Sequence, residues 1–146
     1  MAKFVYRMQN ILDLKEKLES QEKIAYGIAN ANLLSEQEKL RKLFVRRAEY
    51  ESQLKELSSG TIDVRKIKRC RDAISAMKSL IRDQMMNVQK AEKELEAARA
   101  RLDEVMKDRK THENLREKAF EQFKKELSAE ENKAVDELVS YNYHKQ

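Results

Sequence analysis

Residues 67–105 decide the fold, and they read IKRCRDAISAMKSLIRDQMMNVQKAEKELEAARARLDEV. Apolar side chains, with one exception, recur in this stretch at alternating spacings of three and four residues. The ladder comprises Ile67, Cys70, Ile74, Met77, Ile81, Gln84, Val88, Ala91, Leu95, Ala98, Leu102 and Val105. A mean spacing of 3.5 residues keeps side chains on one stripe of an α-helix, which is the seam of a left-handed coiled coil. The stretch therefore predicts a long helix that packs against another helix.

A second, earlier ladder supplies the partner helix. It comprises Leu40, Leu43, Arg47, Tyr50, Leu54 and Leu57. Further upstream, the apolar residues follow a shifted phase through Phe4, Ile11, Leu18 and Ala25, with Leu14 and Ile28 alongside. Beyond Val105 the second helix's ladder weakens, and it resumes out of phase at Phe120.

The two ladders are separated by Ser58-Ser59-Gly60-Thr61, the one cluster of helix breakers in the sequence. Glycine just after the last periodic residue is a common helix stop, and Thr61 or Asp63 can cap the next helix. The sequence predicts an all-α fold, a long antiparallel two-helix coiled-coil hairpin within a single domain 1–146. Its helices are expected at about 3–57 and 63–127, joined by a turn at 58–61.

The hairpin register follows if Ser58 faces Thr61. Tyr50 then lies opposite Arg69 or Cys70, Arg47 pairs with Asp72, and Phe4 lies opposite Leu115. Residues from about 116 to 146 are left without a partner strand, which predicts a C-terminal helical overhang with a helix at 129–143.

The overhang carries an apolar stripe at helical spacing, and an uncovered stripe of this kind predicts a docking surface. The stripe comprises Phe120, Phe123, Leu127, Ala134, Leu138 and Tyr141. An alternative stays open, in which the segment folds back along the hairpin after a capping box at 128–131.

Composition excludes several classes of protein. The chain has no proline, no tryptophan and two glycines, whereas sandwiches, barrels and α/β folds need frequent turn residues. No run of about 18 apolar residues exists, so no membrane insertion is expected. A single cysteine, Cys70, fits a reducing cytoplasm. His112 and His144 have no metal-ligand spacing, so neither an enzyme nor a metal or other cofactor is predicted.

The formal net charge of +5 has a local source at the start of the second helix. The cluster comprises Arg65, Lys66, Lys68, Arg69 and Arg71. Such a basic patch attracts an acidic protein surface, a phosphate backbone or an anionic membrane, but no aromatic residues interleave with it, so nucleic acid is not the expected partner. A solvated face that keeps this end soluble is the alternative.

Cations also crowd near the chain termini, where apolar residues are few. They are Lys3, Arg7, Arg109, His112 and Arg116. Like charges placed together predict looser helix pairing at this end.

Three short patterns resemble the flagellar export protein FliJ family. The N-terminal pattern comprises Phe4, Tyr6, Arg7, Met8, Gln9, Leu12, Leu14, Lys15 and Glu19. The middle pattern is Glu49-Tyr50 followed by Leu54, and the C-terminal one comprises Glu131, Lys133, Asp136 and Glu137. The N-terminal pattern is the most specific, because a heptad repeat does not require its Phe, Tyr, Arg and Gln.

The resemblance implies a small cytoplasmic coiled coil of the flagellar type III export apparatus, monomeric when free. It would associate with the inner membrane only through that apparatus. Its paired termini would enter the pore of the export ATPase hexamer and promote assembly of the ring. Its mid-hairpin would contact the cytoplasmic domain of the export gate, and it would also bind export chaperones.

Site residues follow from the same resemblance. The ATPase-binding residues are expected to be Phe4, Tyr6, Arg7, Gln9, Phe120, Phe123, Asp136 and Glu137. The residues that bind the export gate are expected to be Leu43, Tyr50, Met77 and Leu80. Lys39, Arg46 and Gln84 depart from what a gate-binding surface of this family requires. Leu43, Tyr50 and Met77 are also seam positions, so a purely structural role for them stays open.

Other functions remain open at this stage. One is the corresponding stalk of an injection apparatus. A second is a nucleic-acid-binding coiled coil that uses Arg65–Arg71. A third is a general chaperone or scaffold hairpin that holds clients on the stripe from Phe120 to Tyr141.

Overall fold

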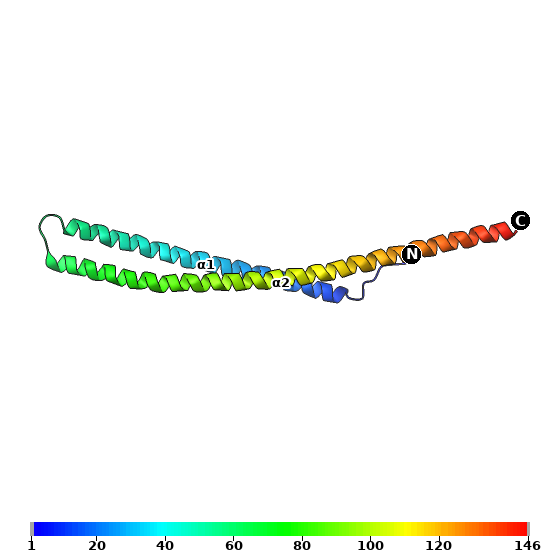
Figure 1. The fold of residues 1–146 in the computed structure, drawn as a ribbon, viewed down its shortest axis with the longest axis horizontal. Coiled ribbons are helices and arrows are strands. Elements are labelled where there is room, and N and C mark those ends of the chain that lie inside the picture. The colour runs from blue at the N-terminus through cyan, green and yellow to red at the C-terminus, as the bar shows by residue number, and fades with distance from the viewer. Residues whose placement is uncertain (1, 146) are drawn as a thin grey trace. The chain divides into compact units, whose positions relative to one another are not determined.

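The computed structural model describes residues 2–145, and Figure 1 shows two long helices joined by a turn. Helix α1 spans Gln9–Leu57 and helix α2 spans Val64–Lys145. They run antiparallel and pack against each other, and the described residues contain no strand. The predicted all-α helical hairpin is therefore confirmed.

The turn between the helices follows from its residues. Gly60 has a φ of 87°, in the left-handed region that disfavours residues with a side chain. The Oγ atoms of Ser58 and Ser59 donate to the main-chain oxygens of Leu54 and Glu56, at 2.8 and 2.9 Å. Asp63 caps α2, because its Oδ1 accepts hydrogen bonds from the amides of Arg65 and Lys66 at 3.1 and 3.4 Å.

Tertiary contacts divide the chain into two units. The turn unit is Glu22–Leu102, and the terminal unit is Met1–Gln21 with Asp103–Gln146. Each unit is an antiparallel pairing of α1 or its N-terminal flank with α2.

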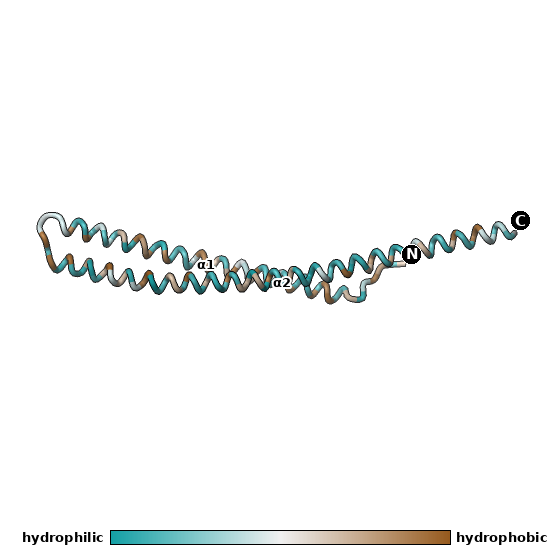
Figure 2. Tube along the Cα trace, in the orientation of Figure 1, coloured by the Kyte–Doolittle hydropathy of each residue, from teal (hydrophilic) through white to brown (hydrophobic). Residues whose placement is uncertain are grey.

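The core of the turn unit is the predicted α2 ladder. Its buried members are Cys70, Ile74, Met77, Ile81, Gln84, Val88, Ala91 and Ala98. Figure 2 shows apolar residues that recur along α2 instead of forming a continuous run, as expected for a helix with one buried stripe.

The seam of α1 keeps one heptad phase from Leu12 to Leu57, so the predicted phase shift upstream of Leu40 is wrong, although Leu18 and Ala25 of the predicted phase are half-buried beside the seam. Its buried and half-buried seam positions are Leu12, Lys15, Glu19, Glu22, Tyr26, Ala29, Leu33, Glu36, Leu40, Leu43, Arg47, Tyr50, Leu54 and Leu57. Ile11, Leu14 and Ile28 are instead 39%, 54% and 58% exposed. The phase was predicted wrongly because charged residues occupy several seam positions of α1, where they pair with residues of α2.

The first helix begins later than predicted. Residues 2–8 are not helical and form a strap, so α1 starts at Gln9 and not near residue 3. An extended chain advances about 3.3 Å per residue, whereas a helix advances 1.5 Å. The strap therefore carries Phe4 past Leu115, its predicted neighbour, to Phe120 and Phe123.

Helix α2 continues without a break to Lys145, so the separate helix predicted at 129–143 is part of α2. Ser128 does not begin a new helix, and the fold-back alternative is not formed. No proline or glycine follows Gly60, so nothing in the sequence forces an interruption. Every residue from 128 to 144 is exposed, and the uncovered C-terminal stretch therefore begins about twelve residues later than predicted.

Candidate partner-binding surfaces

The strap binds the α2 stripe of the terminal unit through Phe4. The ring centroid of Phe4 lies 5.0 Å from that of Phe120, in an edge-on arrangement, and 5.5 Å from that of Phe123. The guanidinium of Arg116 lies 5.6 Å from the centre of the Phe4 ring, within cation–π range. The first two phenylalanines of the predicted docking stripe are thus already in contact with the chain's own N-terminal segment.

A groove of about 500 Å³ runs beside this contact. Residues 3–8 of the strap form one wall, and Ala119, Gln122, Phe123 and Glu126 of α2 form the other. The Tyr6 hydroxyl is buried and has no hydrogen-bond partner among the described residues. The strap is therefore held mainly by ring packing.

Two of the cations that were predicted to loosen this end have partners that link or neutralise them. Arg109 pairs with the buried Glu19 of α1 and, at 2.7 Å, with Glu113 of its own helix. Arg116 Nε donates to Gln9 Oε1 at 2.8 Å. Arg109 and Arg116 thus join the helices at the end where looser pairing was predicted.

A second ion pair lies beside the first. Lys15 Nζ lies 2.7 Å from Asp108 Oδ2, and this hydrogen bond is the main cause that lowers the pKa of Asp108. His112 Nε2 lies 3.6 Å from the other carboxylate oxygen of Asp108. The sequence analysis named Lys15 and Glu19 only in the N-terminal pattern and missed that they lie in the seam and pair with Asp108 and Arg109, although the heptad phase from Leu40 could have placed both in the seam.

The eight predicted ATPase-binding residues divide into two groups. The strap and the start of α1 bring Phe4, Tyr6, Arg7 and Gln9 to the part of α2 that carries Phe120 and Phe123. Asp136 and Glu137 are exposed and lie further along α2, about 20 Å away at the helical rise of 1.5 Å per residue.

The predicted gate-binding residues are mostly core residues. Met77 is 8% exposed, and Leu43 and Tyr50 are half-buried. The Cys70 thiol donates to the Tyr50 main-chain oxygen at 3.0 Å, which confirms the predicted Tyr50–Cys70 pairing. Only Leu80, 46% exposed, presents a large apolar surface to a partner.

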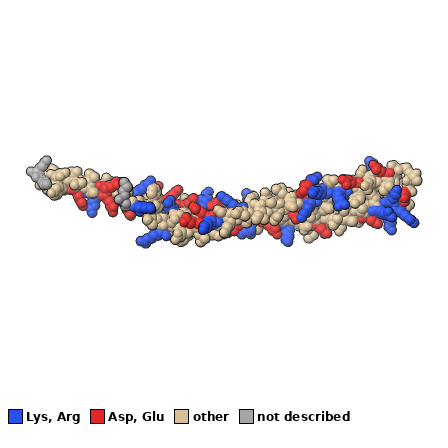
Figure 3. All heavy atoms as spheres, turned by 180° about the vertical axis from the view of Figure 1, so that it is seen from behind, with Lys and Arg blue, Asp and Glu red and all other residues tan. Residues whose placement is uncertain are grey.

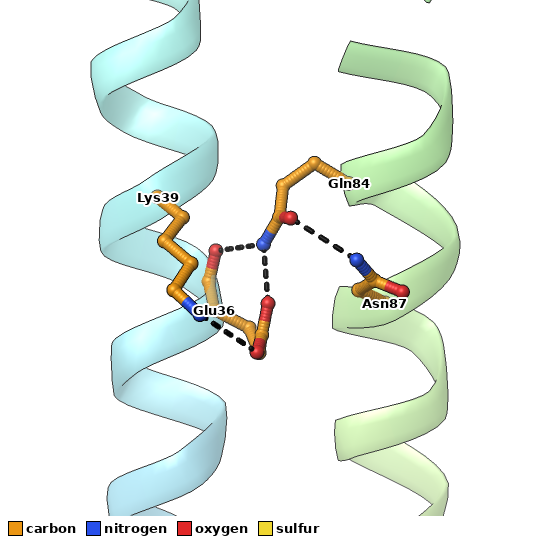
Figure 4. Close-up of polar contacts among 4 residues, drawn as sticks. All are labelled: Glu36, Lys39, Gln84 and Asn87. Atoms are coloured by element: carbon orange, nitrogen blue, oxygen red, sulfur yellow. Dashed lines mark hydrogen bonds and ion pairs between the residues drawn. The ribbon is translucent and has the colours of Figure 1, made fainter. Parts of the chain in front are cut away.

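A polar layer in the middle of the turn unit escaped the sequence analysis (Figure 4). Gln84 is 8% exposed, and its Nε2 donates to the main-chain oxygen of Glu36 at 2.9 Å and to Oε2 of the same residue at 2.5 Å. Asn87 Nδ2 donates to Gln84 Oε1 at 3.2 Å, and Lys39 lies 3.4 Å from Glu36. The bond from Gln84 is the main cause that lowers the pKa of Glu36. A buried polar residue of this kind fixes helix register, because any slip leaves it unpaired.

The predicted pairing of Arg47 with Asp72 is not formed among residues 2–145. Arg47 Nε lies 3.0 Å from Glu51 Oε1, one turn away on α1. An i, i+4 pair needs no particular hairpin register, so the polar layer at Gln84, and not Arg47, supplies the register-specific contact.

All five residues of the basic cluster are exposed at the start of α2. The first turn of this helix has no acidic residue. Cations near a helix N-terminus are disfavoured by the helix dipole, so the cluster does not serve the stability of α2.

Two kinds of site are absent from the described part of the chain. No group of three or more His, Cys, Asp or Glu residues within it is arranged to hold a metal ion. Neither of its helices has the length and apolar character needed to cross a bilayer.

Comparison with known proteins bears on this geometry. The family model described as "Flagellar FliJ protein" matches residues 4–146, which include most of the strap and both helices. The chain belongs to the FliJ family. No curated protein matches it significantly.

A solved structure has the same fold as this FliJ-family chain. It is that of the protein CT670 from Chlamydia trachomatis, described as a YscO homologue, with a TM-score of 0.73 and 23% sequence identity. The alignment covers 99% of this chain and 99% of the other. At this level of identity the similarity demonstrates a shared fold.

Proposed function

We propose that this chain is a non-enzymatic stalk component of a flagellar type III export apparatus. It promotes assembly of the export ATPase ring, links the ring to the export gate and handles export chaperones. Membership of the FliJ family over residues 4–146 is the observation that carries the proposal. The proposed location is the cytoplasm, at the face of the inner membrane that holds the apparatus.

The proposed ATPase-binding surface is the exposed end of α2 together with the strap. Leu138 and Tyr141 are 62% and 60% exposed, and they share a helix face with Ala134 because they are spaced by four and three residues. Glu137 adds negative charge beside them, whereas Asp136 lies on the opposite face of the helix. Apolar side chains of this size give a partner substantial area to bury.

The strap restricts how the rest of the stripe is used. Phe4 already packs on Phe120 and Phe123, so a partner meets these rings as one aromatic cluster with Tyr6, Arg7 and Gln9 around it. We assign this cluster to the part of the terminal unit that supports the ATPase contact.

The proposed gate-binding surface centres on Leu80. The other predicted residues, Leu43, Tyr50 and Met77, are seam residues and contribute mainly by holding the two helices together. The basic cluster at Arg65–Arg71 is available to attract an acidic partner surface.

The proposal is tested with the purified type III export ATPase. Addition of the full chain is expected to increase hexamer formation and ATP turnover. The double variant Leu138→Glu/Tyr141→Glu places charge on the apolar face and is expected to lose the stimulation. The matched control Ala129→Glu/Ser140→Glu places the same charge on the opposite face of the same segment and should retain it. Unchanged turnover with the full chain, or equal loss in both variants, contradicts the proposal.

A further inference from the structure

The outer face of α1 in the turn unit inverts the usual distribution of polar and apolar residues. Ile24, Ile28 and Leu34 are 65%, 58% and 59% exposed, whereas Glu22 and Glu36 lie half-buried in the seam. Helices in two-stranded coiled coils normally place apolar residues inside and charged residues outside. Three large aliphatic side chains on one outer face therefore need an explanation that the hairpin does not supply.

The same segment is free of charge. Residues 24–35 read IAYGIANANLLS, in a chain of which 39% is charged. On α2, residues 84–89 lie at the level of the C-terminal part of this segment and are also uncharged, and Met85 and Met86 are 44% and 68% exposed. The α2 residues at the level of its N-terminal part include the charged Lys90, Glu92, Lys93, Glu94 and Glu96. Figure 3 shows a mostly tan band on one face, between stretches with many basic (blue) and acidic (red) residues. We call the exposed residues Ile24, Gly27, Ile28, Ala31 and Leu34 the α1 outer patch.

Gly27 is the second unusual feature of the patch. Glycine inside a helix weakens it, and the structure gives no internal reason for this one. A Cβ atom built at Gly27 would meet nothing within 4 Å, so the residue makes no room for any other part of the chain. Ala31, one turn further, is also exposed. The two residues leave a shallow notch on the surface of α1 between larger side chains.

The notch of one copy can accommodate the isoleucines of a second copy that is related to it by a two-fold axis. If two copies of α1 cross antiparallel with Gly27 beside Ile28 of the other copy, Ile24 lies beside Ala31. Each isoleucine then meets a small residue, and each small residue meets an isoleucine. An isologous dimer interface has this self-complementary property.

An uncharged patch lets a second copy approach without burying a charged group. The chain carries a net charge of +5, so two copies repel each other weakly as a whole. The α1 outer patch carries no charge. Its area is nevertheless limited to a few side chains, below the roughly 800 Å² per partner of a standard stable interface, so the association is weak.

We propose that the α1 outer patch is a self-association surface, at which a second copy of this chain binds with micromolar affinity. The inference is independent of the proposed export function. A chain with this patch is monomeric in dilute solution and dimerises when it is concentrated, for instance when several copies are held on one assembly.

Sedimentation equilibrium of the full chain tests the proposal. The mean mass is expected to rise from that of a monomer at about 1 μM toward that of a dimer at about 300 μM, as a Kd of tens of micromolar requires. Ile28→Glu buries a carboxylate in the interface and should weaken dimerisation at least about tenfold. Val45→Glu, at another exposed apolar position of α1, is the matched control and should leave it unchanged.

A third variant separates self-association from helix stability. Gly27→Leu fills the notch, so it should raise the melting temperature of the monomer, because leucine favours the helix, and yet weaken dimerisation. A wild-type chain that stays monomeric at all these concentrations overturns the proposal. That result is expected if the patch binds a different protein. Equal effects of Ile28→Glu and Val45→Glu also overturn it.

Discussion

The turn unit and the terminal unit use the same heptad spacing for different contacts. In the turn unit, the α2 seam is apolar from Cys70 to Ala98 except for Gln84. In the terminal unit Leu12 is buried, but ion pairs also join the helices there, Arg109 with Glu19 and Lys15 with Asp108. Beyond these pairs, the strap replaces α1 and packs through Phe4.

This difference has consequences for stability and for binding. Apolar burial is insensitive to salt and contributes most of the stability of a helix pair. Partly buried ion pairs add little net stability, but they penalise the loss of either partner. We therefore expect the turn unit to hold the hairpin together, and the terminal unit to be the part that rearranges more readily on binding.

The largest expected effect is a cavity in the turn unit. Ile81 is 4% exposed, and Ile81→Ala should lower the free energy of unfolding by about 3 kcal/mol. The neighbouring Leu80 is 46% exposed, and Leu80→Ala should cost less than about 0.7 kcal/mol. Urea unfolding followed by circular dichroism measures both. Equal effects would mean that Ile81 is not in the seam.

An intermediate effect is expected from the terminal unit. Glu19→Gln removes the charge that pairs with Arg109 and should lower the free energy of unfolding by about 2 kcal/mol, because the guanidinium stays partly buried. Glu16→Gln, at an exposed position three residues earlier, is the control and should change little. Amide hydrogen exchange should locate the loss of protection in the terminal unit. A loss confined to the turn unit would contradict the division between the two.

The smallest effect concerns pH. The pKa values of Glu36 and Asp108 are lowered in the folded chain, so the unfolded chain binds more protons and the stability that they contribute is present above their unfolded values. That contribution should decline as the pH falls from about 5 through 3. The double variant Glu36→Gln/Asp108→Asn should have a shallower dependence of unfolding free energy on pH in this range. An unchanged slope would show that the pKa values of these carboxylates are the same in the folded and the unfolded chain.

The two units also differ in how far the sequence predicted them. The α2 ladder from Ile67 to Val105 was identified because apolar residues fill nearly every seam position. The same method failed between Leu12 and Glu36, where charged residues lie inside because their partners, such as Arg109, come from the other helix. Single-sequence periodicity detects apolar burial and is blind to pairs that are distant in sequence.

The site was less predictable than the fold for related reasons. The strap was expected to be helical, so the contact of Phe4 with Phe120 and Phe123 was missed. The capping pattern at Ser128 is a local signal, and the uninterrupted helix on both sides overrides it. The α1 outer patch was not predicted, because the sequence analysis placed Ile28 next to the packed ladder, whereas it is exposed on the outer face.

The central claim is that α1 keeps one heptad phase, with charge in the seam and aliphatic residues outside. Thiol labelling of single cysteines at neighbouring positions, in a Cys70→Ala background and in dilute solution, tests it most directly. Cysteine at Ile28, which is 58% exposed, should react at nearly the rate of a free peptide, whereas cysteine at the half-buried Ala29 should be protected severalfold. Protection at position 28 with rapid labelling at position 29 would contradict the phase of α1 and, with it, the outer patch.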